Sequence, residues 1–475
     1  MAITRKRLLT ILLVALCVVV CTGPPLDPWH TQRLSAEFTA RDADEITTLE
    51  DYLALEERLF AQLQDEVYSE VPTGHEFALF RYSSGSLADP GTRSPNFNRT
   101  FELPVDNPVG GLLLLHGLTD SPYSLRALGQ KLHEQGFWVV GLRLPGHGTA
   151  PSALRYASWR DMAAATRLAM RHLDKILGDK PIHIAGYSNG AALAIDHAIE
   201  AMSDPMLTRP ASLILLSPSI GVSASAAAAA PIAMISKAPG FGRLAWTETT
   251  PEFDPYKYNS FPVNGGAIAR SLTQSVARRI ARLSQSESAS SFPPILVFKS
   301  AVDATVSTDA VIDRLLGRLP DNGNELVLFD INRSAAASVL LVSDPGPFTR
   351  RLFADPSLPF GITFITNDND TSISIVQRYK PPFSAAVTEV SDLDLQWPRG
   401  IISLSHVALP FPPDDPLYGA IRPESRNELH LGQIAIRGER GLMVLSSDWL
   451  LRLRHNPFYS VLEDRVLEWV SVENQ

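Results

Sequence analysis

The stretch Gly186-Tyr187-Ser188-Asn189-Gly190 decides the fold of this chain, together with what lies on either side of it. An apolar run at 181–185 precedes it, and an alanine-rich run with helical spacing follows it at 191–199. This order predicts a strand, a sharp turn and a helix, with the serine at the tip of the turn. Glycine is expected on both sides because side chains there would collide with the strand and the helix. A serine in this position projects its hydroxyl above the sheet, so Ser188 is a candidate nucleophile.

Apolar runs and helical patterns alternate around this turn. Strands are expected at 110–115, 137–142, 181–185, 211–216, 294–299 and 325–329, and helices at 124–135, 159–177 and 308–319. Near-continuous apolar strands alternating with helices predict an α/β fold with a mostly parallel central sheet and helices on both faces. Outside this region, helices are expected at 45–68 and 458–472, and strands at 76–82 and 98–103.

Two long segments interrupt the alternation and suggest how the chain is organised. Residues 219–292 separate two core strands, contain a helical pattern at 267–283 and are expected to form a cap or lid. Residues 332–398 follow the last clear core strand and look β-rich, with a hairpin around 367–370, so they are expected to loop out of the core and return. The expected units are a leader 1–23, an N-terminal helix and first strands 24–108, the first part of the core 109–218, the cap 219–292, the second part of the core 293–331, the β-rich insertion 332–398 and the completion of the core 399–475.

The first residues have the pattern of an export signal. Three cations at 5–7 precede an apolar run at 8–21, which is short against the ~20 residues that span a bilayer. The expectation is an exported protein, periplasmic or extracellular, either released or anchored to the membrane by residues 8–21. A buried N-terminal helix is the alternative. Both cysteines, Cys17 and Cys21, lie here, so the rest of the chain can form no disulfide.

Bulk composition excludes one class of partner. The formal net charge is -9 over 475 residues, and no basic stripe offsets it, so nucleic acid is not an expected partner. With 45% hydrophobic and 20% charged residues, the composition is that of a globular protein. Neither cysteine has the spacing of a metal or redox site.

A second stretch, at 112–119, ends a predicted strand in His116-Gly117-Leu118. A strand that ends in His-Gly just before a helix places backbone N–H groups beside the nucleophile, and a tetrahedral intermediate needs two such donors. The backbone N–H groups of Leu118 and Asn189 are the expected pair. The alternative is that His116 and Gly117 only close a turn, and His116 is in either case expected to support the loop.

The order of the motifs resembles the α/β-hydrolase superfamily, in its branch of bacterial carboxylesterases and monoacylglycerol-lipase-like enzymes of the serine aminopeptidase type. The matching stretches, in chain order, lie at 116–122, 144–148, 158–159, 186–190, 303–306 and 403–406. Family members arrange their catalytic residues as nucleophile, acid and histidine along the chain. The resemblance implies Ser188 as nucleophile and Asp303, after a core strand, as the acid. A turn or helix-cap role is the other interpretation of Asp303.

Three histidines follow Asp303 in the chain. His406 follows a strand-like run at 401–402 and precedes a proline-rich bend, which suits a base held on a rigid turn. His430 lies between two leucines in a strand-like run, and His455 precedes Asn-Pro at the start of the last helix, so both are expected to be structural. His406 is therefore the expected base, although the insertion separates it from Asp303.

The resemblance implies a serine ester hydrolase without cofactor or metal. The implied substrates are short- or medium-chain acyl esters, monoacylglycerols or lysophospholipids. A peptidase or acyltransferase with the same triad, and a catalytically silent scaffold, remain alternatives. An aromatic segment at 253–262 resembles the cap of such esterases; its rings either roof an acyl pocket or hold the cap to the core.

Overall fold

A computed structural model describes residues 25–221, 229–236, 238, 240–303, 305–335, 341, 344–424, 428–432 and 452–472. The expected leader at 1–23, with both cysteines, lies outside the described residues. Within those ranges, no helix is both long enough and apolar enough to cross a membrane.

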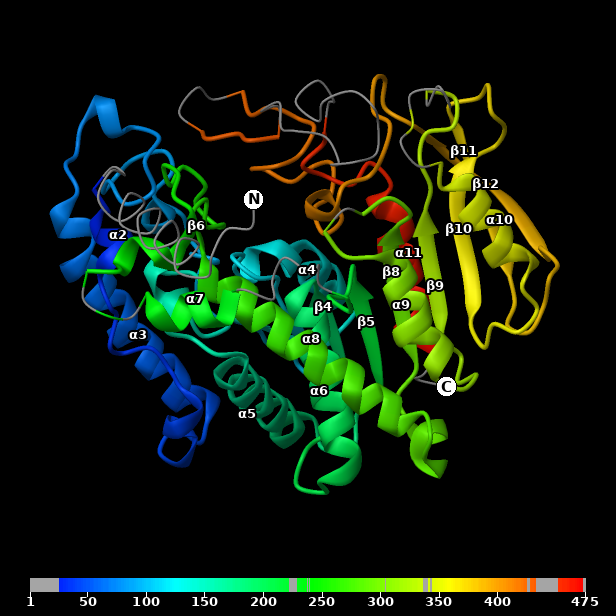
Figure 1. Ribbon diagram of the computed structural model, residues 1–475, viewed down its shortest axis with the longest axis horizontal. Helices are drawn as coiled ribbons and strands as arrows, with labels where there is room; N and C mark the ends of the chain where they lie inside the picture. Colours follow the sequence, from blue (N-terminus) through cyan, green and yellow to red (C-terminus); the bar gives the residue numbers. More distant parts are fainter. Residues whose placement is uncertain are drawn as a thin grey trace, which may run out of the picture.

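A mixed sheet forms the centre of the described chain (Figure 1). Its order is β1-β3-β2-β4-β5-β8-β9-β10-β11-β12, and the strands from β3 to β10 in this order are parallel, whereas β1, β11 and β12 run antiparallel to their neighbours. The strands are β1 Phe101–Leu103, β2 Gly110–Leu115, β3 Phe137–Leu142, β4 Ile182–Tyr187, β5 Ser212–Leu216, β8 Ile295–Ser300, β9 Glu325–Phe329, β10 Gly361–Asn367, β11 Ser374–Lys380 and β12 Glu389–Gln396. A separate two-stranded ribbon pairs β6 Trp246–Glu248 with β7 Phe261–Pro262.

Helices cover both faces of this sheet. The α-helices of the described residues are α2 Pro28–Thr31, α3 Leu49–Glu66, α4 Arg126–Glu134, α5 Trp159–Leu177, α6 Asn189–Ser203, α7 Ala229–Ile235, α8 Val263–Leu283, α9 Thr308–Arg314, α10 Gly346–Ala354 and α11 Tyr459–Val472. Helices α5, α6, α8 and α9 share one apolar cluster with the strands, and α4 and α11 share a second cluster on the other face. The predicted α/β fold with a mostly parallel sheet and two covered faces is confirmed.

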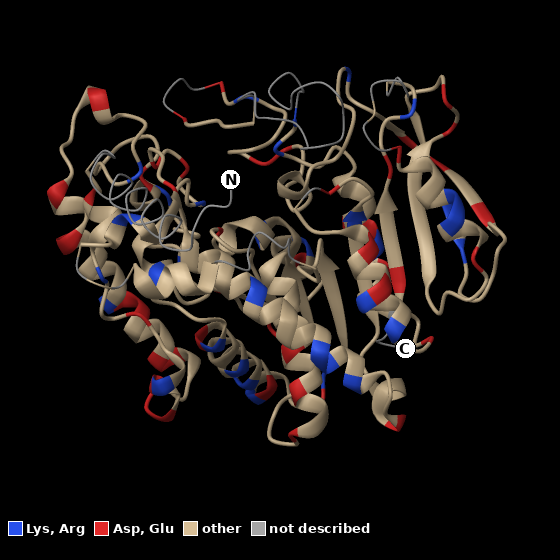
Figure 2. Cartoon of the chain, viewed as in Figure 1, with Lys and Arg blue, Asp and Glu red and all other residues tan. Residues whose placement is uncertain are grey.

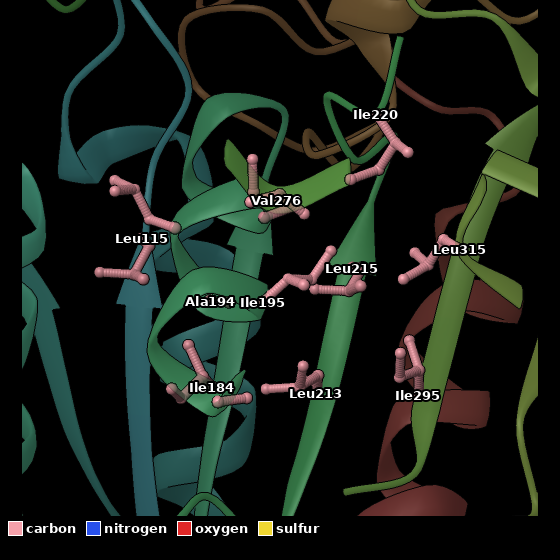
Figure 3. Packing of buried hydrophobic residues seen from close by; sticks show 14 of the residues in the cluster. Leu115, Ile184, Ala194, Ile195, Leu213, Leu215, Ile220, Val276, Ile295 and Leu315 are labelled. Carbon is pink, nitrogen blue, oxygen red and sulfur yellow. The ribbon is translucent and has the colours of Figure 1, made fainter. Parts of the chain in front are cut away.

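Packing on the first face explains why the chain is so apolar around β4 and β5. Figure 3 shows Ile184 and Leu213 from the strands in one cluster with Ile195 of α6 and Val276 of α8. Figure 2 shows many charged residues along α3, α5 and α8 and almost none in the middle strands. The alternation of buried strands and one-sided helices in the sequence thus corresponds to three layers.

The segment at 332–398 differs from its prediction. It is β-rich, and the expected hairpin is present as β10 paired with β11. However, its strands do not loop away from the core, because β10 pairs in parallel with β9 and continues the central sheet. The last core strand is therefore not the one at 325–329, and β11 and β12 extend the sheet to its far edge (Figure 1).

Two smaller strand predictions are wrong. Residues 76–82 form turns that include a 3-10 helix at His75–Phe77, and residues 401–402 lie in irregular structure. In the first case the aromatic side chains pack instead on Trp29, whose ring lies 4.8 Å from that of Phe80 and 5.7 Å from that of Tyr82. A tertiary aromatic cluster has thus overridden the local strand preference.

Candidate active site

Ser188 occupies the turn between β4 and α6 in a strained conformation. Its backbone has φ 53° and ψ -109°, a region that residues other than glycine rarely occupy. Its N–H donates to Leu216 O at 2.9 Å, and its carbonyl accepts from Ser219 N at 3.1 Å, so strand β5 and the segment after it hold the turn in place. Strain of this kind persists only where the surroundings determine it, and such residues are concentrated at functional sites.

The two glycines of the turn are required by close packing, as expected. A Cβ atom on Gly190 would lie 2.0 Å from Leu115 O, and one on Gly186 would lie 2.5 Å from Ala191 Cα. Both contacts are shorter than any tolerated distance and involve backbone atoms, which cannot move aside. The turn thus brings α6 directly against the end of β2.

His406 lies beside Ser188 in the structure. Its Nε2 is 3.1 Å from Ser188 Oγ, and its Nδ1 is 2.8 Å from Asp303 Oδ2. Because the carboxylate only accepts, Nδ1 carries the proton, and Nε2 is then free to accept from the serine hydroxyl. The hydroxyl of Tyr187 donates to the backbone carbonyl of His406 at 3.2 Å, which fixes the short helical turn His406–Ala408 to β4.

Asp303 lies in the loop after β8 and is held from several sides. Its Oδ1 accepts from the backbone N–H groups of Thr305 at 2.8 Å and Val306 at 2.9 Å. Its Oδ2 accepts from His406 and also from the ammonium of Lys299, a fully buried residue of β8. Burial alone would raise the pKa of Asp303, but the His406 ring and the Lys299 ammonium lower it far below the usual carboxyl range.

The three predicted residues Ser188, Asp303 and His406 are thus brought together, although an entire sheet extension lies between the last two in the sequence. The chain returns to the site from this extension over a short distance, because β9, β10 and β11 lie side by side. It passes over the carboxyl ends of the strands. Asn332 N donates to Ile402 O at 2.7 Å, which ties the returning segment to the end of β9.

The two backbone N–H groups predicted as oxyanion donors lie in the loop after β2 (Leu118) and at the start of α6 (Asn189). Within the described residues, the backbone N–H groups of Leu118 and Asn189 donate to no protein acceptor. Asn189 is the first residue of α6, where N–H groups have no partner inside the helix. Thr119 has φ 67°, and its carbonyl accepts from Tyr258 N of the cap at 2.9 Å. The cap therefore contacts the loop directly.

The other histidines of the motifs have structural contacts. His116 Nε2 accepts from Leu144 N at 3.1 Å, and His147 Nδ1 lies 3.1 Å from Pro145 O; both rings are buried. Burial and the neighbouring His147 lower the pKa of His116 well below its ordinary value. His430 and His455 contact the backbone carbonyls of Gly419 and Tyr418, respectively. None of these four rings contacts Ser188 in the described part of the chain.

Sequence reasoning did not identify Lys299 or the cap contact of Lys257. A lysine inside the apolar strand at 295–300 was a visible signal, since a charge there needs a buried partner. Lys257 Nζ lies 2.8 Å from Asp120 Oδ1, next to the loop that carries Leu118. The aromatic residues beside Lys257 hold the cap to the core: the ring of Tyr256 stacks on that of Tyr123 at 3.9 Å. No group of three or more metal-ligating side chains occurs among the described residues.

Comparison with known proteins relates part of this chain to a family. Residues 106–331 match the family described as "Serine aminopeptidase, S33". A thermostable monoacylglycerol lipase from Bacillus sp. (strain H-257) is 30% identical over 91 residues, which cover 19% of this chain and 36% of the relative. The matched part thus spans about a third of that relative's length. The family match over this part of the chain, together with the sheet topology, gives the protein an α/β-hydrolase fold, with a similarity to the serine aminopeptidase-type branch.

Solved structures with similar parts include two lipolytic proteins. A monoacylglycerol lipase of Paleococcus ferrophilus is 18% identical with a TM-score of 0.36, over 49% of this chain and 88% of that chain. A structure of the metagenome-derived lipolytic enzymes LipS and LipT is 21% identical with a TM-score of 0.37, over 49% of this chain and 87% of that chain.

Proposed function

We propose that this protein hydrolyses carboxylic esters through an acyl-enzyme formed on Ser188. The observation that carries the proposal is the chain of contacts from Ser188 Oγ to His406 Nε2 at 3.1 Å and from His406 Nδ1 to Asp303 Oδ2 at 2.8 Å. A serine hydroxyl is a weak nucleophile until a neighbouring base takes its proton, and a base acts well only when a third group fixes its tautomer.

In the proposed mechanism, Ser188 Oγ attacks the ester carbonyl while His406 Nε2 takes the hydroxyl proton. Asp303 stabilises the imidazolium that forms. The oxyanion accepts from the backbone N–H groups of Leu118 and Asn189, each of which is worth ~2.7–4 kcal/mol of barrier in comparable sites. His406 then protonates the leaving alcohol, and a water molecule activated by the same ring hydrolyses the acyl-enzyme.

The proposed substrates are short- or medium-chain acyl esters, including monoacylglycerol-like or lysophospholipid-like lipids. The names of the similar proteins support an ester of this class, since they include monoacylglycerol lipases from two organisms. Nucleic acid is not a proposed partner, because the formal charge of -9 would repel it.

A peptidase is the second candidate, because the matched family is described as a serine aminopeptidase. Ester and amide cleavage use the same three residues, so the site geometry favours neither. An aminopeptidase needs an acidic or carbonyl group that binds the α-amino group of its substrate. An assay that compares aminoacyl amides with simple esters therefore separates the two candidates. An acyltransferase differs only in the acceptor of the acyl group.

The decisive experiment combines labelling and turnover. The full chain should react with a fluorophosphonate probe and hydrolyse 4-nitrophenyl esters of two to twelve carbons, and Ser188→Ala should abolish both. His406→Ala should lower kcat by about 10³-fold or more, whereas His430→Ala and His455→Ala serve as matched controls that keep most activity. Folded protein that does not label would exclude a serine hydrolase, and faster cleavage of aminoacyl amides than of esters would favour the peptidase.

We propose that the protein is located outside the cytoplasm. The basis is the export-signal pattern at 1–21, which lies outside the described residues. Expression of the full chain and of a variant lacking residues 1–23, followed by fractionation, tests this proposal. Activity of the full chain in the cytoplasmic fraction would contradict it.

A further inference from the structure

Lys299 is a buried lysine that has no role in the mechanism proposed above. It lies in β8, opposite Leu328 of β9, and its side chain is fully enclosed. A charged ammonium inside a protein is unfavourable unless it is paired and hydrogen-bonded. A residue of this kind near the end of a buried, mostly apolar strand therefore calls for a specific partner.

The partner is the acid of the triad. Lys299 Nζ donates to Asp303 Oδ2, the same oxygen that accepts from His406 Nδ1, and also to Val306 O at 2.8 Å. The second contact ties the ammonium to the loop that supplies two N–H groups to Asp303 Oδ1. One carboxylate oxygen is thus shared by the Lys299 ammonium and by a ring that becomes cationic in the proposed mechanism.

We infer that Lys299 is a positioning residue that acts on His406 through Asp303 and sets the lower pH limit of activity. The inference rests on the proposed function. Asp303 stabilises the protonated ring, and the positive charge behind Asp303 opposes part of that stabilisation. The neutral ring, which is the form that can accept the serine proton, then persists to lower pH than it would beside an unpaired carboxylate.

The low polarity of the surroundings makes this effect substantial. Interactions between charges are screened far less in the interior than in water, and both Lys299 and Asp303 are buried. In the described part of the chain, the ionisable groups in contact with the His406 ring are Asp303 and Tyr187, whose ring centroid lies 5.2 Å away. The phenol of Tyr187 donates to a carbonyl and carries no charge at neutral pH.

The test is the pH profile of kcat/KM for the full chain with a 4-nitrophenyl ester, measured from pH 4 to 9. Lys299→Met removes the charge, and Lys299→Gln removes it while keeping an N–H donor. Lys380 offers a matched control, because it is equally buried, lies in β11 at the far part of the sheet and donates to Asp355 O at 2.7 Å. Lys380→Met therefore removes a buried ammonium without touching the triad.

The acidic limb of the profile should move to higher pH by about one unit in both Lys299 variants and stay in place in Lys380→Met. A purely structural role would lower the melting temperature and the plateau without moving the limb, so an unmoved limb in folded Lys299 variants overturns the inference. Failure of both Lys299 variants to fold, with Lys380→Met folded, also counts against it. Wild-type protein that neither labels at Ser188 nor hydrolyses esters would instead overturn the proposed function.

Discussion

The ammonium of Lys257 lies 2.8 Å from Asp120 Oδ1 and joins the cap to the loop after β2. The next residue, Tyr258, donates its N–H to Thr119 O at 2.9 Å, so two consecutive cap residues hold the same loop. Thr119 has φ 67°, a conformation that needs such support. The position of the Leu118 N–H group, one residue earlier, therefore depends on the cap.

Removal of this ion pair should weaken turnover more than binding. In Lys257→Met, we expect kcat to fall about tenfold with little change in KM, because a displaced oxyanion donor acts on the transition state alone. Lys131→Met is a control, since Lys131 is partly exposed and its ammonium makes a long surface contact of 3.9 Å with Glu134. If kcat falls and KM rises by the same factor in Lys257→Met, or if neither changes, the cap does not act on catalysis through this ion pair.

Glycine-to-alanine changes in two helices should have opposite effects. A Cβ on Gly190 in α6 would lie 2.0 Å from Leu115 O, so Gly190→Ala should cost several kcal/mol, roughly 3 or more, and abolish activity. In α8, a Cβ on Gly266 would meet only Ala229 Cβ at 3.6 Å, an ordinary contact. Gly266→Ala should therefore raise stability by ~0.5–1 kcal/mol. Denaturant unfolding of both variants checks the pair, and a harmless Gly190→Ala would refute the packing argument.

Local signals made the turn at Ser188 predictable from the sequence. Glycine spacing, an apolar run and a helical run all act within about 20 residues, and β4 and α6 have nearly the expected bounds. The choice of His406 followed from chain order and the nature of its surroundings, and the structure places it against Ser188. Asp303 was located in the same way, after a predicted strand.

The parts that were not predictable depend on contacts between distant segments. Strand β10 has an apolar pattern that fits either a free hairpin or a core strand, and only pairing with β9 decides between them. The apolar and aromatic residues at 76–82 fit a strand as well as a loop, and only the packing of Trp29 against Phe80 decides between them. The sequence showed Lys299 only as an unusual charged residue in a buried run and gave no sign of its pairing with Asp303.

A buried ion network should make the stability of the protein much more sensitive to substitution of Glu56 in α3 than to substitution of the next residue, Glu57. Glu56 Oε2 accepts from Arg143 Nε at 2.9 Å and Glu56 Oε1 from Thr100 N at 2.8 Å, so it joins α3 to the end of β3. Glu56→Gln should cost about 3 kcal/mol, because a buried guanidinium loses part of its counter-charge. Glu57, the next residue, is 72% exposed, and Glu57→Gln should change the melting temperature little. Similar effects of the two changes would contradict this interpretation.

Acid should destabilise this protein through its buried neutral histidines. Burial lowers the pKa of His183 in β4 to about 4, against about 6.5 in an unfolded chain. The neutral ring is thus favoured in the folded state. Its contribution to the free energy of unfolding, at most ~3 kcal/mol, is complete above pH ~6.5 and is lost as the pH falls towards 4. Burial lowers the pKa of His147 to about 4 as well, so both rings lower the free energy of unfolding over the same pH range.

Replacement of one ring should remove its share of this acid sensitivity. His183 Nδ1 lies 2.8 Å from Ser212 Oγ, and His183→Asn keeps a hydrogen-bonding group near that hydroxyl without a titrating one. We expect the melting temperature of this variant to fall less between pH 7.5 and 4.5 than that of the wild type, whatever their difference at pH 7.5. His75→Asn, at an exposed position, should leave the pH dependence unchanged. Parallel melting curves for His183→Asn and wild type across this range would show that protonation of His183 does not drive the loss, because the linkage between proton binding and folding requires the slopes to differ.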